Sequence, residues 1–271
     1  MLTFHKMIQG CREGDAEAWR ALVAQYTPVL AGVAKAYSSD PGRIAGAWRG
    51  VLGSLAGHDF AALKEVEAQS DREFFSVLRA SLLEQFTAGP EDLTSPDGLD
   101  TITVLEDLSR LMRESPLVHQ NMMFLHLTGY SDPDIELILR ISPAVAQRSV
   151  ERLNAAFWAD FRRSMEAAHW QAAWLRMNRR MRRSKTPDCV PIRPLIRILD
   201  GQFGWYEKDP IERHLGACLH CLEAWVGLQE ITHWMQRGTP LTPAQVDELL
   251  SGLPVKAKSQ GRFSLLKRAF R

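Results

Sequence analysis

The sequence has no long apolar run and almost no net charge. Its 271 residues include 33 Lys and Arg against 32 Asp and Glu, which gives a formal net charge of +1. No stretch approaches the length of apolar sequence that a membrane-spanning helix requires, and the first ten residues lack the apolar core of a signal peptide. We therefore expect a cytoplasmic protein without a membrane span, and the net charge by itself indicates no class of partner.

Cysteine is also scarce, with four in the chain. Three of them combine with a histidine in the pattern C-x24-H-x3-C-x2-C, formed by Cys189, His214, Cys218 and Cys221. Three thiolates and one imidazole fill the tetrahedral shell of a structural zinc and leave no open position for water. The pattern therefore predicts a closed Zn2+ site, the alternative being three buried free cysteines and a surface histidine.

Two local geometries fit the last three of these residues. On a continuous helix, His214, Cys218 and Cys221 would share one face, with His220 pointing away from it. If Gly216 breaks the helix, the C-x2-C segment forms a tight turn that presents two thiolates. In both cases we expect Cys189 to complete the site from a distance, and His220 to lie outside it.

Catalytic motifs are missing as well. The chain contains no G-x-x-x-x-G-K-[ST], H-E-x-x-H or G-x-S-x-G segment. Because the predicted zinc site is closed, it offers no position for a substrate or an activated water. We therefore do not expect an enzyme.

Sustained strand alternation is absent, and apolar residues recur with a period near 3.6 through most of the chain. This period predicts helices from Asp15 to Tyr37, with Pro28 between two helices or at the start of the second, and from Arg43 to Leu55. Further helices are expected after a cap at Ser70 or Asp71, and after Thr242. The expected fold class is all-α, with two small helical domains plus a small zinc-stabilised helical domain.

Charge is distributed unevenly despite the neutral total. From Arg140 to Lys185 basic residues greatly outnumber acidic ones, and the tail from Lys256 is basic again. Local basic blocks favour nucleic acid or an acidic protein surface as a partner. The alternative for the central block is a set of solvated helix faces.

The segment from Gly129 to Phe157 predicts two short helices joined by a tight turn. Ser131 and Asp134 resemble a capping box, and Ser142 with Pro143 begins the second helix. Val145, Val150 and Leu153 are the expected inward positions of that helix. Its candidate DNA contacts are Ser142, Ala144, Gln147, Arg148, Glu151 and Arg152, because amide and guanidinium groups pair with base edges and phosphates. An ordinary helical hairpin is the alternative.

These segments resemble a known family. Gly129 to Ser142 is similar to region 4 of bacterial sigma-70 factors, where the run G-L-S-x-x-E-I-A-x-x-L-G-I-S precedes the recognition helix. Gly14 to Leu30 and Asp71 to Phe86 resemble region 2 of the extracytoplasmic-function group. The segment L-D-G-Q-F at Leu199 to Phe203, followed by H-L-x-x-C-x-x-C, resembles a zinc-binding anti-sigma module.

The resemblance implies a sequence of domains along the chain. The run G-P-E-D-L-T-S-P-D-G from Gly89 to Gly98 is typical of a linker. The expected units are a region 2-like helical domain at 1–88, a linker at 89–100, a region 4-like helix-turn-helix domain at 101–175, a basic connector at 176–187, a zinc-binding anti-sigma-like domain at 188–238, and a short helix with a basic tail at 239–271.

The function that this resemblance implies is that of a DNA-binding transcription initiation factor, which directs RNA polymerase to promoter DNA. The fused zinc unit would pack on both sigma-like units, restrain them and bury the DNA-facing helix. The alternative is a sigma-derived DNA-binding or factor-sequestering regulator that no longer engages core polymerase. This alternative is suggested by the segment from Arg43 to Leu55. The segment has no acidic residue and no Gln, where the family has an acidic run containing Gln.

Overall fold

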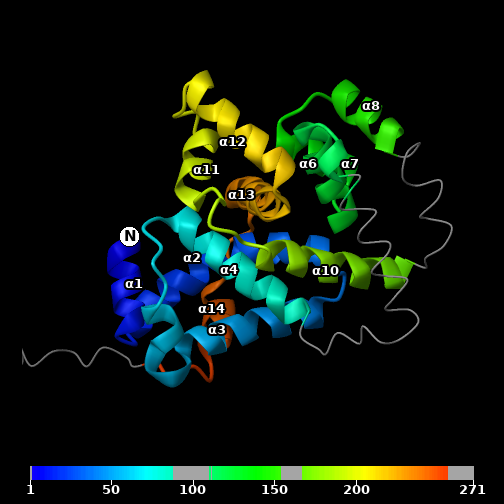
Figure 1. The fold of residues 1–271 in the computed structure, drawn as a ribbon. Helices are drawn as coiled ribbons and strands as arrows, with labels where there is room; N and C mark the ends of the chain where they lie inside the picture. The colour runs from blue at the N-terminus through cyan, green and yellow to red at the C-terminus, as the bar shows by residue number, and fades with distance from the viewer. Residues whose placement is uncertain (1, 88–109, 111, 154–166, 256–271) are drawn as a thin grey trace, which may run out of the picture.

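The computed structural model describes residues 2–87, 110, 112–153 and 167–255, and every regular element within them is an α-helix (Figure 1). The all-α prediction is confirmed at this level, and the division into domains stays a prediction. The predicted linker at 89–100 and the tail from residue 256 lie outside the described residues. The helices are α1 (Phe4–Arg12), α2 (Ala16–Tyr37), α3 (Pro41–Lys64), α4 (Asp71–Phe86), α6 (Leu117–Thr128), α7 (Asp132–Leu139), α8 (Pro143–Leu153), α10 (Ala167–Arg183), α11 (Ile192–Leu199), α12 (Trp205–Ala217), α13 (Leu219–Arg237) and α14 (Pro243–Leu250).

Several helices begin where their capping residues predict. The side chains of Asp15, Ser70 and Thr242 each accept a hydrogen bond from a backbone N–H in the first turn of α2, α4 and α14. At Pro28 the prediction was wrong, because α2 runs through this residue without a break. Residues on both sides of Pro28 are buried in the same apolar cluster, and this shared packing outweighs the loss of one helical hydrogen bond.

Helix α3 is longer than predicted and contains a sharp turn. His58, Asp59 and Phe60 all have left-handed backbone angles, with φ of 47°, 54° and 61°. Phe60 is buried there, with its ring 5.9 Å from that of Trp19. Burial of this aromatic ring contributes about 1.5–3 kcal/mol and so offsets part of the cost of about 1–2 kcal/mol for each left-handed residue.

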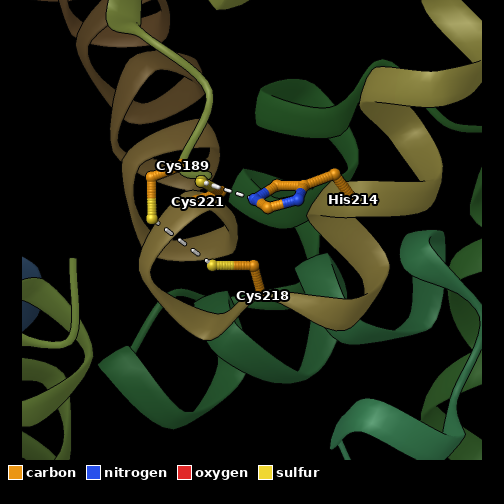
Figure 2. Close-up of side chains that lie close together, drawn as sticks. All are labelled: Cys189, His214, Cys218 and Cys221. Carbon is orange, nitrogen blue, oxygen red and sulfur yellow. Dashed lines mark hydrogen bonds between the residues drawn. The ribbon is translucent and has the colours of Figure 1, made fainter. Parts of the chain in front are cut away.

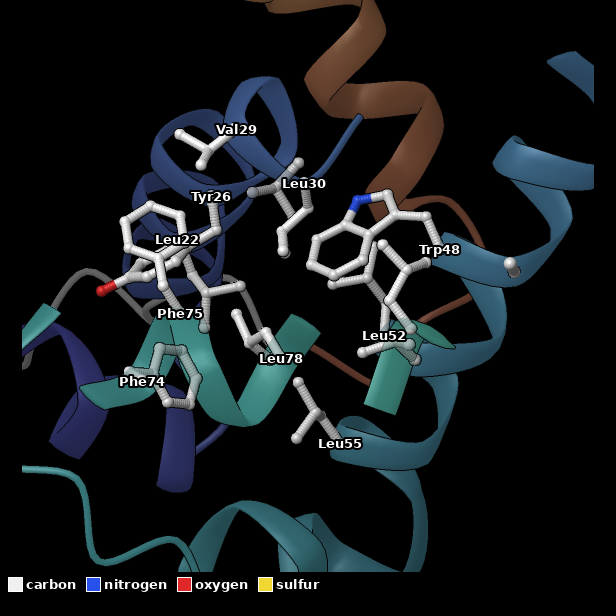
Figure 3. Packing of buried hydrophobic residues seen from close by; sticks show 14 of the residues in the cluster. Leu22, Tyr26, Val29, Leu30, Trp48, Leu52, Leu55, Phe74, Phe75 and Leu78 are labelled. Carbon is white, nitrogen blue, oxygen red and sulfur yellow. The ribbon is translucent and has the colours of Figure 1, made fainter. Parts of the chain in front are cut away.

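The largest apolar cluster lies among the first four helices (Figure 3). Tyr26 of α2 packs against Phe74 and Phe75 of α4, with ring centroids 5.0 and 4.3 Å apart. Trp48 and Leu52 bring α3 into the same cluster. Each fully buried side chain of this size contributes about 1.5–3 kcal/mol, and Leu175, Ile231, Val246 and Leu250 from later helices complete the same cluster.

Helix α13 takes part in all three apolar clusters of the described residues. Ile231 belongs to the cluster among α1–α4, and Val226 to the one formed mainly by α6, α7 and α10. Trp225 and Leu228 belong to the cluster around α11 and α12. Helix α13 consequently packs against α2, α4, α6, α7, α10, α11 and α12.

Part of the predicted basic connector is helical, because α10 extends to Arg183. Three of its arginines, Arg179, Arg182 and Arg183, place guanidinium nitrogens 3.0 Å from the carboxylate of Glu84 in α4. These basic side chains therefore pair within the chain. None of the described helices is both long and apolar enough to cross a lipid bilayer.

Candidate metal centre and nucleic-acid interface

The four predicted metal ligands come from separate elements and meet in space (Figure 2). Cys189 lies between α10 and α11, His214 in the last turn of α12, and Cys221 in the first turn of α13. Cys218 is the single extended residue between α12 and α13, with φ −111° and ψ 109°. Its N–H donates to His214 O at 2.8 Å, and its carbonyl accepts from Leu222 N at 2.9 Å. The continuous-helix geometry is therefore wrong, and the break lies at Cys218, two residues after Gly216.

The ligand atoms of the four residues all lie within 4.8 Å of one another. Cys189 Sγ and Cys218 Sγ are 3.8 Å apart, and His214 Nε2 is 3.2 Å from Cys221 Sγ. Zn–S bonds of about 2.3 Å at tetrahedral angles separate two sulfurs by about 3.8 Å. A disulfide would need about 2.05 Å, and all three cysteines are free. The cluster could therefore bind a metal such as zinc.

The surroundings shift the pKa values of two thiols of the cluster, Cys189 and Cys221, in opposite directions. Burial alone would raise the pKa of Cys189, but hydrogen bonds from Thr186 outweigh it and the pKa is lowered. The Thr186 backbone N–H donates to Cys189 Sγ at 3.2 Å. For Cys221, burial raises the pKa of the thiol above its usual value. A bound cation would supply the positive charge that a buried thiolate at Cys221 lacks.

His220 lies outside the metal cluster, as the sequence predicted. Its Nδ1 is 2.9 Å from the carbonyl oxygen of Arg182, at the C-terminal end of α10. An imidazole N–H in this position satisfies a carbonyl that has no partner within the helix. His220 thus connects the first turn of α13 to α10.

The predicted helix-turn-helix is formed by α7 and α8. The Ser131 hydroxyl accepts from Asp134 N and donates to Asp134 Oδ2 at 2.6 Å, which caps α7 as its sequence predicted. The turn residue Arg140 has φ 55° and ψ 42°, the left-handed conformation that glycine adopts most easily. Ile141 N donates to Glu136 O at 3.1 Å and closes the turn. Arg140 therefore adopts the conformation at a cost of about 1–2 kcal/mol.

Five of the six predicted DNA contacts have described side chains, and all five are exposed: Ser142, Ala144, Gln147, Arg148 and Glu151. Gln147 Nε2 donates to Glu151 Oε1 at 3.1 Å, and Arg148 Nε donates to Ala144 O at 2.9 Å. Arg152 is in α8, but its side chain lies outside the described part. The expectation that the zinc unit buries this face is therefore wrong for these five residues, since α13 packs on α6 and α7 instead.

The inward face of α8 includes a residue outside the predicted set. Ala146 is buried, 2% exposed, and packs in the cluster with α6 and α7. Val145 is half-buried, and the side chains of Val150 and Leu153 lie outside the described part. A small residue fits because α8 lies close to α6 and α7 at this point. The apolar pattern alone favours larger side chains, so it did not single out Ala146.

The sequence reasoning missed a buried charged group that joins α4, α2 and α13. Arg79 pairs with Glu223 and Glu230, at N···O distances of 2.6 and 2.5 Å, and its guanidinium donates to the Tyr37 hydroxyl at 2.8 Å. A signal was present in the sequence. Arg79 interrupts the apolar face of α4, and Glu223 and Glu230 are seven residues apart in α13, which places them on one face of that helix.

Comparison of the chain with protein-family models, with curated proteins and with solved structures finds no match.

Proposed function

We propose that this protein is a sigma-factor-like DNA-binding transcription initiation factor, restrained by a fused zinc-holding unit. The observation that carries the proposal is the position of α13. This helix begins at the metal cluster and packs against α2 and α4, which resemble sigma region 2. It also packs against α6 and α7, which belong to the region 4-like unit. A helix held in this way limits how far the two sigma-like units can separate.

The exposed face of α8 supports the DNA-binding part of the proposal. Gln147 and Arg148 are exposed, and each makes its hydrogen bond within α8. Such bonds exchange readily for contacts with base edges and phosphates when a helix enters the major groove. The region 4-like unit would therefore bind the upstream promoter element, with α8 as the reading helix.

Zinc would act on this arrangement through structure. Cys189, His214, Cys218 and Cys221 would hold the ion, and their four side chains fill a tetrahedral shell. The ion would fix the ends of α12 and α13 and the segment before α11. Because α8 stays exposed, the restraint would act on the relative placement of the sigma-like units, with the DNA-facing surface left open.

The second candidate is a sigma-derived regulator that does not engage core polymerase. The segment from Arg43 to Leu55 forms the first part of α3, and its exposed residues include Gly46, Arg49 and Gly53. Arg49 pairs with Glu248 of α14 at 2.6 Å, with both side chains more than half exposed. A face that presents glycine and a paired arginine differs from the acidic face expected for polymerase binding, and this favours the alternative.

The two candidates are separated by a transcription assay with purified core polymerase. The full chain would be added to core enzyme and a library of bacterial promoter fragments, with and without a zinc chelator. The proposal predicts promoter-specific transcripts that increase after chelation. The absence of transcripts under both conditions, with no core polymerase retained by the immobilised protein, would replace the proposal with the second candidate.

A matched pair of variants tests the role of α8 in the same assay. Arg148→Ala should weaken DNA binding by about 1–3 kcal/mol if the guanidinium contacts a base, and less if it contacts a phosphate. Arg213→Ala is the control, because Arg213 is also exposed and also bonds a residue four positions earlier, Asp209. Equal effects of the two variants would argue against α8 as the reading helix.

A further inference from the structure

A buried polar network surrounds Glu230 in the middle of α13. Arg79 Nε donates to Glu230 Oε2 at 2.8 Å, and Arg79 Nη1 donates to Glu223 Oε1 at 2.6 Å. Arg79 Nη2 donates to Tyr37 OH at 2.8 Å. All four residues are at most 4% exposed. The guanidinium thus joins α4 to α2 and to two successive positions on one face of α13.

The same network reaches the start of the helix-turn-helix. Tyr130 lies between α6 and α7, and its hydroxyl accepts from Trp234 Nε1 of α13 at 3.2 Å. Burial raises the pKa of Glu230, and the nearby Tyr130 hydroxyl opposes this shift. Glu230 therefore lies close to groups from the N-terminal helices and from the region 4-like unit. Both kinds of contact depend on the placement of α13.

The network begins close to the metal cluster along α13. Glu223 is two residues beyond Cys221, in the part of the helix that starts at Cys218. Gly227 lies between the two glutamates, and a Cβ there would be 2.7 Å from the guanidinium carbon of Arg79. Arg79 therefore lies directly against the backbone of α13. Its pairing with Glu223 requires the first turns of this helix to be formed.

Loss of one charged partner from this buried network would destabilise the folded protein. A buried charge without a partner is far less stable than a paired one, so Arg79 favours the conformation in which both glutamates face it. That conformation keeps the first turn of α13 helical, and this turn holds Cys221 and directly follows Cys218, which both lie within ligand distance of Cys189 and His214. The ion-pair network and the metal cluster thus require the same local structure.

We propose that the network of Arg79, Glu223, Glu230 and Tyr37 is a latch that couples metal binding at the Cys189–His214–Cys218–Cys221 cluster to the packing of α13 on α4 and α2. The latch rests on the metal-holding part of the proposed function and does not require DNA binding. Coupling of this kind is reciprocal. Removing Arg79 weakens metal binding, and removing the metal loosens the contact at Arg79, although Arg79 is not a ligand.

The test is the zinc affinity of the full chain, measured by competition with a chromogenic chelator. Arg79→Met keeps the length and apolar stem of the side chain and removes the charge. It should weaken zinc binding by about tenfold or more, within the range typical of coupling between two separate sites. Arg49→Met is the control, since it breaks an exposed pair with Glu248 and should change the affinity by less than about threefold.

A second variant and a second measurement keep the test decisive if Arg79→Met does not fold. Tyr37→Phe keeps the ring and removes only the hydroxyl that accepts from Arg79. Tyr37→Phe should also weaken zinc binding, as Arg79→Met does. In the wild-type chain, chelation should speed amide exchange in α4 around Arg79, relative to α1.

The outcomes separate the latch from the proposed function. If the wild-type chain binds no zinc, the metal-holding part of the proposed function and the latch are both wrong. If the wild type binds zinc while folded Arg79→Met and Tyr37→Phe bind it equally well, the latch alone is wrong. Unchanged exchange in α4 on chelation would lead to the same conclusion about the latch.

Discussion

At the scale of single residues, Arg79 shows how a charge is kept inside this protein. Burial alone would lower the pKa of its guanidinium, but Glu223 and Glu230 outweigh that effect and raise the pKa. Burial in turn raises the pKa of the neighbouring Tyr37 hydroxyl, which stays protonated. Arg79 therefore carries its charge at every pH at which the protein is folded.

Gly32 of α2 permits the close approach of α13. A Cβ at this position would lie 2.3–2.8 Å from ring atoms of Trp234. Gly32→Ala should therefore lower the free energy of unfolding by about 1–3 kcal/mol, because the tryptophan or the helix must shift. The measurement is urea denaturation of the full chain.

Gly46 of α3 is the control for Gly32. It is also a helical glycine, but a Cβ there would meet no atom within 4 Å. Gly46→Ala should raise the free energy of unfolding by about 0.4–1 kcal/mol through the lower entropy of the unfolded chain. If both substitutions stabilise the protein equally, α13 does not pack against α2 as described.

Glu84 predicts a dependence of stability on pH. Burial alone would raise the pKa of Glu84, but Arg182, Arg183 and Arg179 outweigh it and lower the pKa below its ordinary value of 4.5. As the pH falls, the unfolded chain therefore takes up this proton before the folded protein does. The stability that Glu84 contributes is fully present above about pH 4.5 and is lost as the pH falls through the folded pKa.

Glu84→Gln isolates this contribution. The difference in unfolding free energy between wild type and variant should be positive at about pH 7 and should shrink below about pH 4.5. Urea denaturation over this range measures it. A difference that stays constant with pH would mean that the three arginines of α10 do not act on Glu84.

At the scale of elements, the sequence predicted best those helix starts that are set by local hydrogen bonds. The caps at Ser70 and Thr242 need only a side-chain oxygen and a backbone N–H a few residues away, so their residue types suffice. The meeting of Cys189, His214, Cys218 and Cys221 was predictable from residue type and spacing, because three thiols and an imidazole in this pattern have few other uses. The position of the helix break at Cys218 could not be predicted from the sequence, because it depends on how α12 and α13 pack.

Tertiary packing also explains the other differences. The continuity of α2 through Pro28 and the left-handed turn at His58 to Phe60 both depend on side chains brought together from distant segments. Local propensity argues against both. The buried pairing of Arg79 was missed for the same reason, since its partners lie more than 140 residues away.

The turn between α7 and α8 allows a direct test at this scale. Arg140 holds a left-handed conformation that glycine adopts without strain. Arg140→Gly should therefore raise the free energy of unfolding by about 1 kcal/mol, the left-handed strain less the entropy of the glycine. The same change at Arg148, inside α8, should lower it by about 1 kcal/mol. A loss of stability at Arg140 would argue against this turn geometry.

At the scale of the whole molecule, α13 joins three apolar clusters of the described residues, while the five predicted DNA-facing residues of α8 with described side chains are exposed. DNA binding should therefore persist in the zinc-loaded protein. We expect chelation to change the affinity for a bound promoter fragment by less than about threefold at fixed salt concentration. Fluorescence anisotropy with a labelled fragment measures this, and a tenfold or larger gain on chelation would show that the zinc unit covers the DNA-binding face.

We propose that Cys189, His214, Cys218 and Cys221 hold a metal ion that fixes α13 among the other helices. Native mass spectrometry of the purified full chain should therefore show a mass increase equal to a single zinc ion in the wild type. The increase should be lost in the variant Cys218→Ser/Cys221→Ser. A metal-free mass for a folded wild-type chain purified in the presence of zinc would show that the four residues do not form a zinc site.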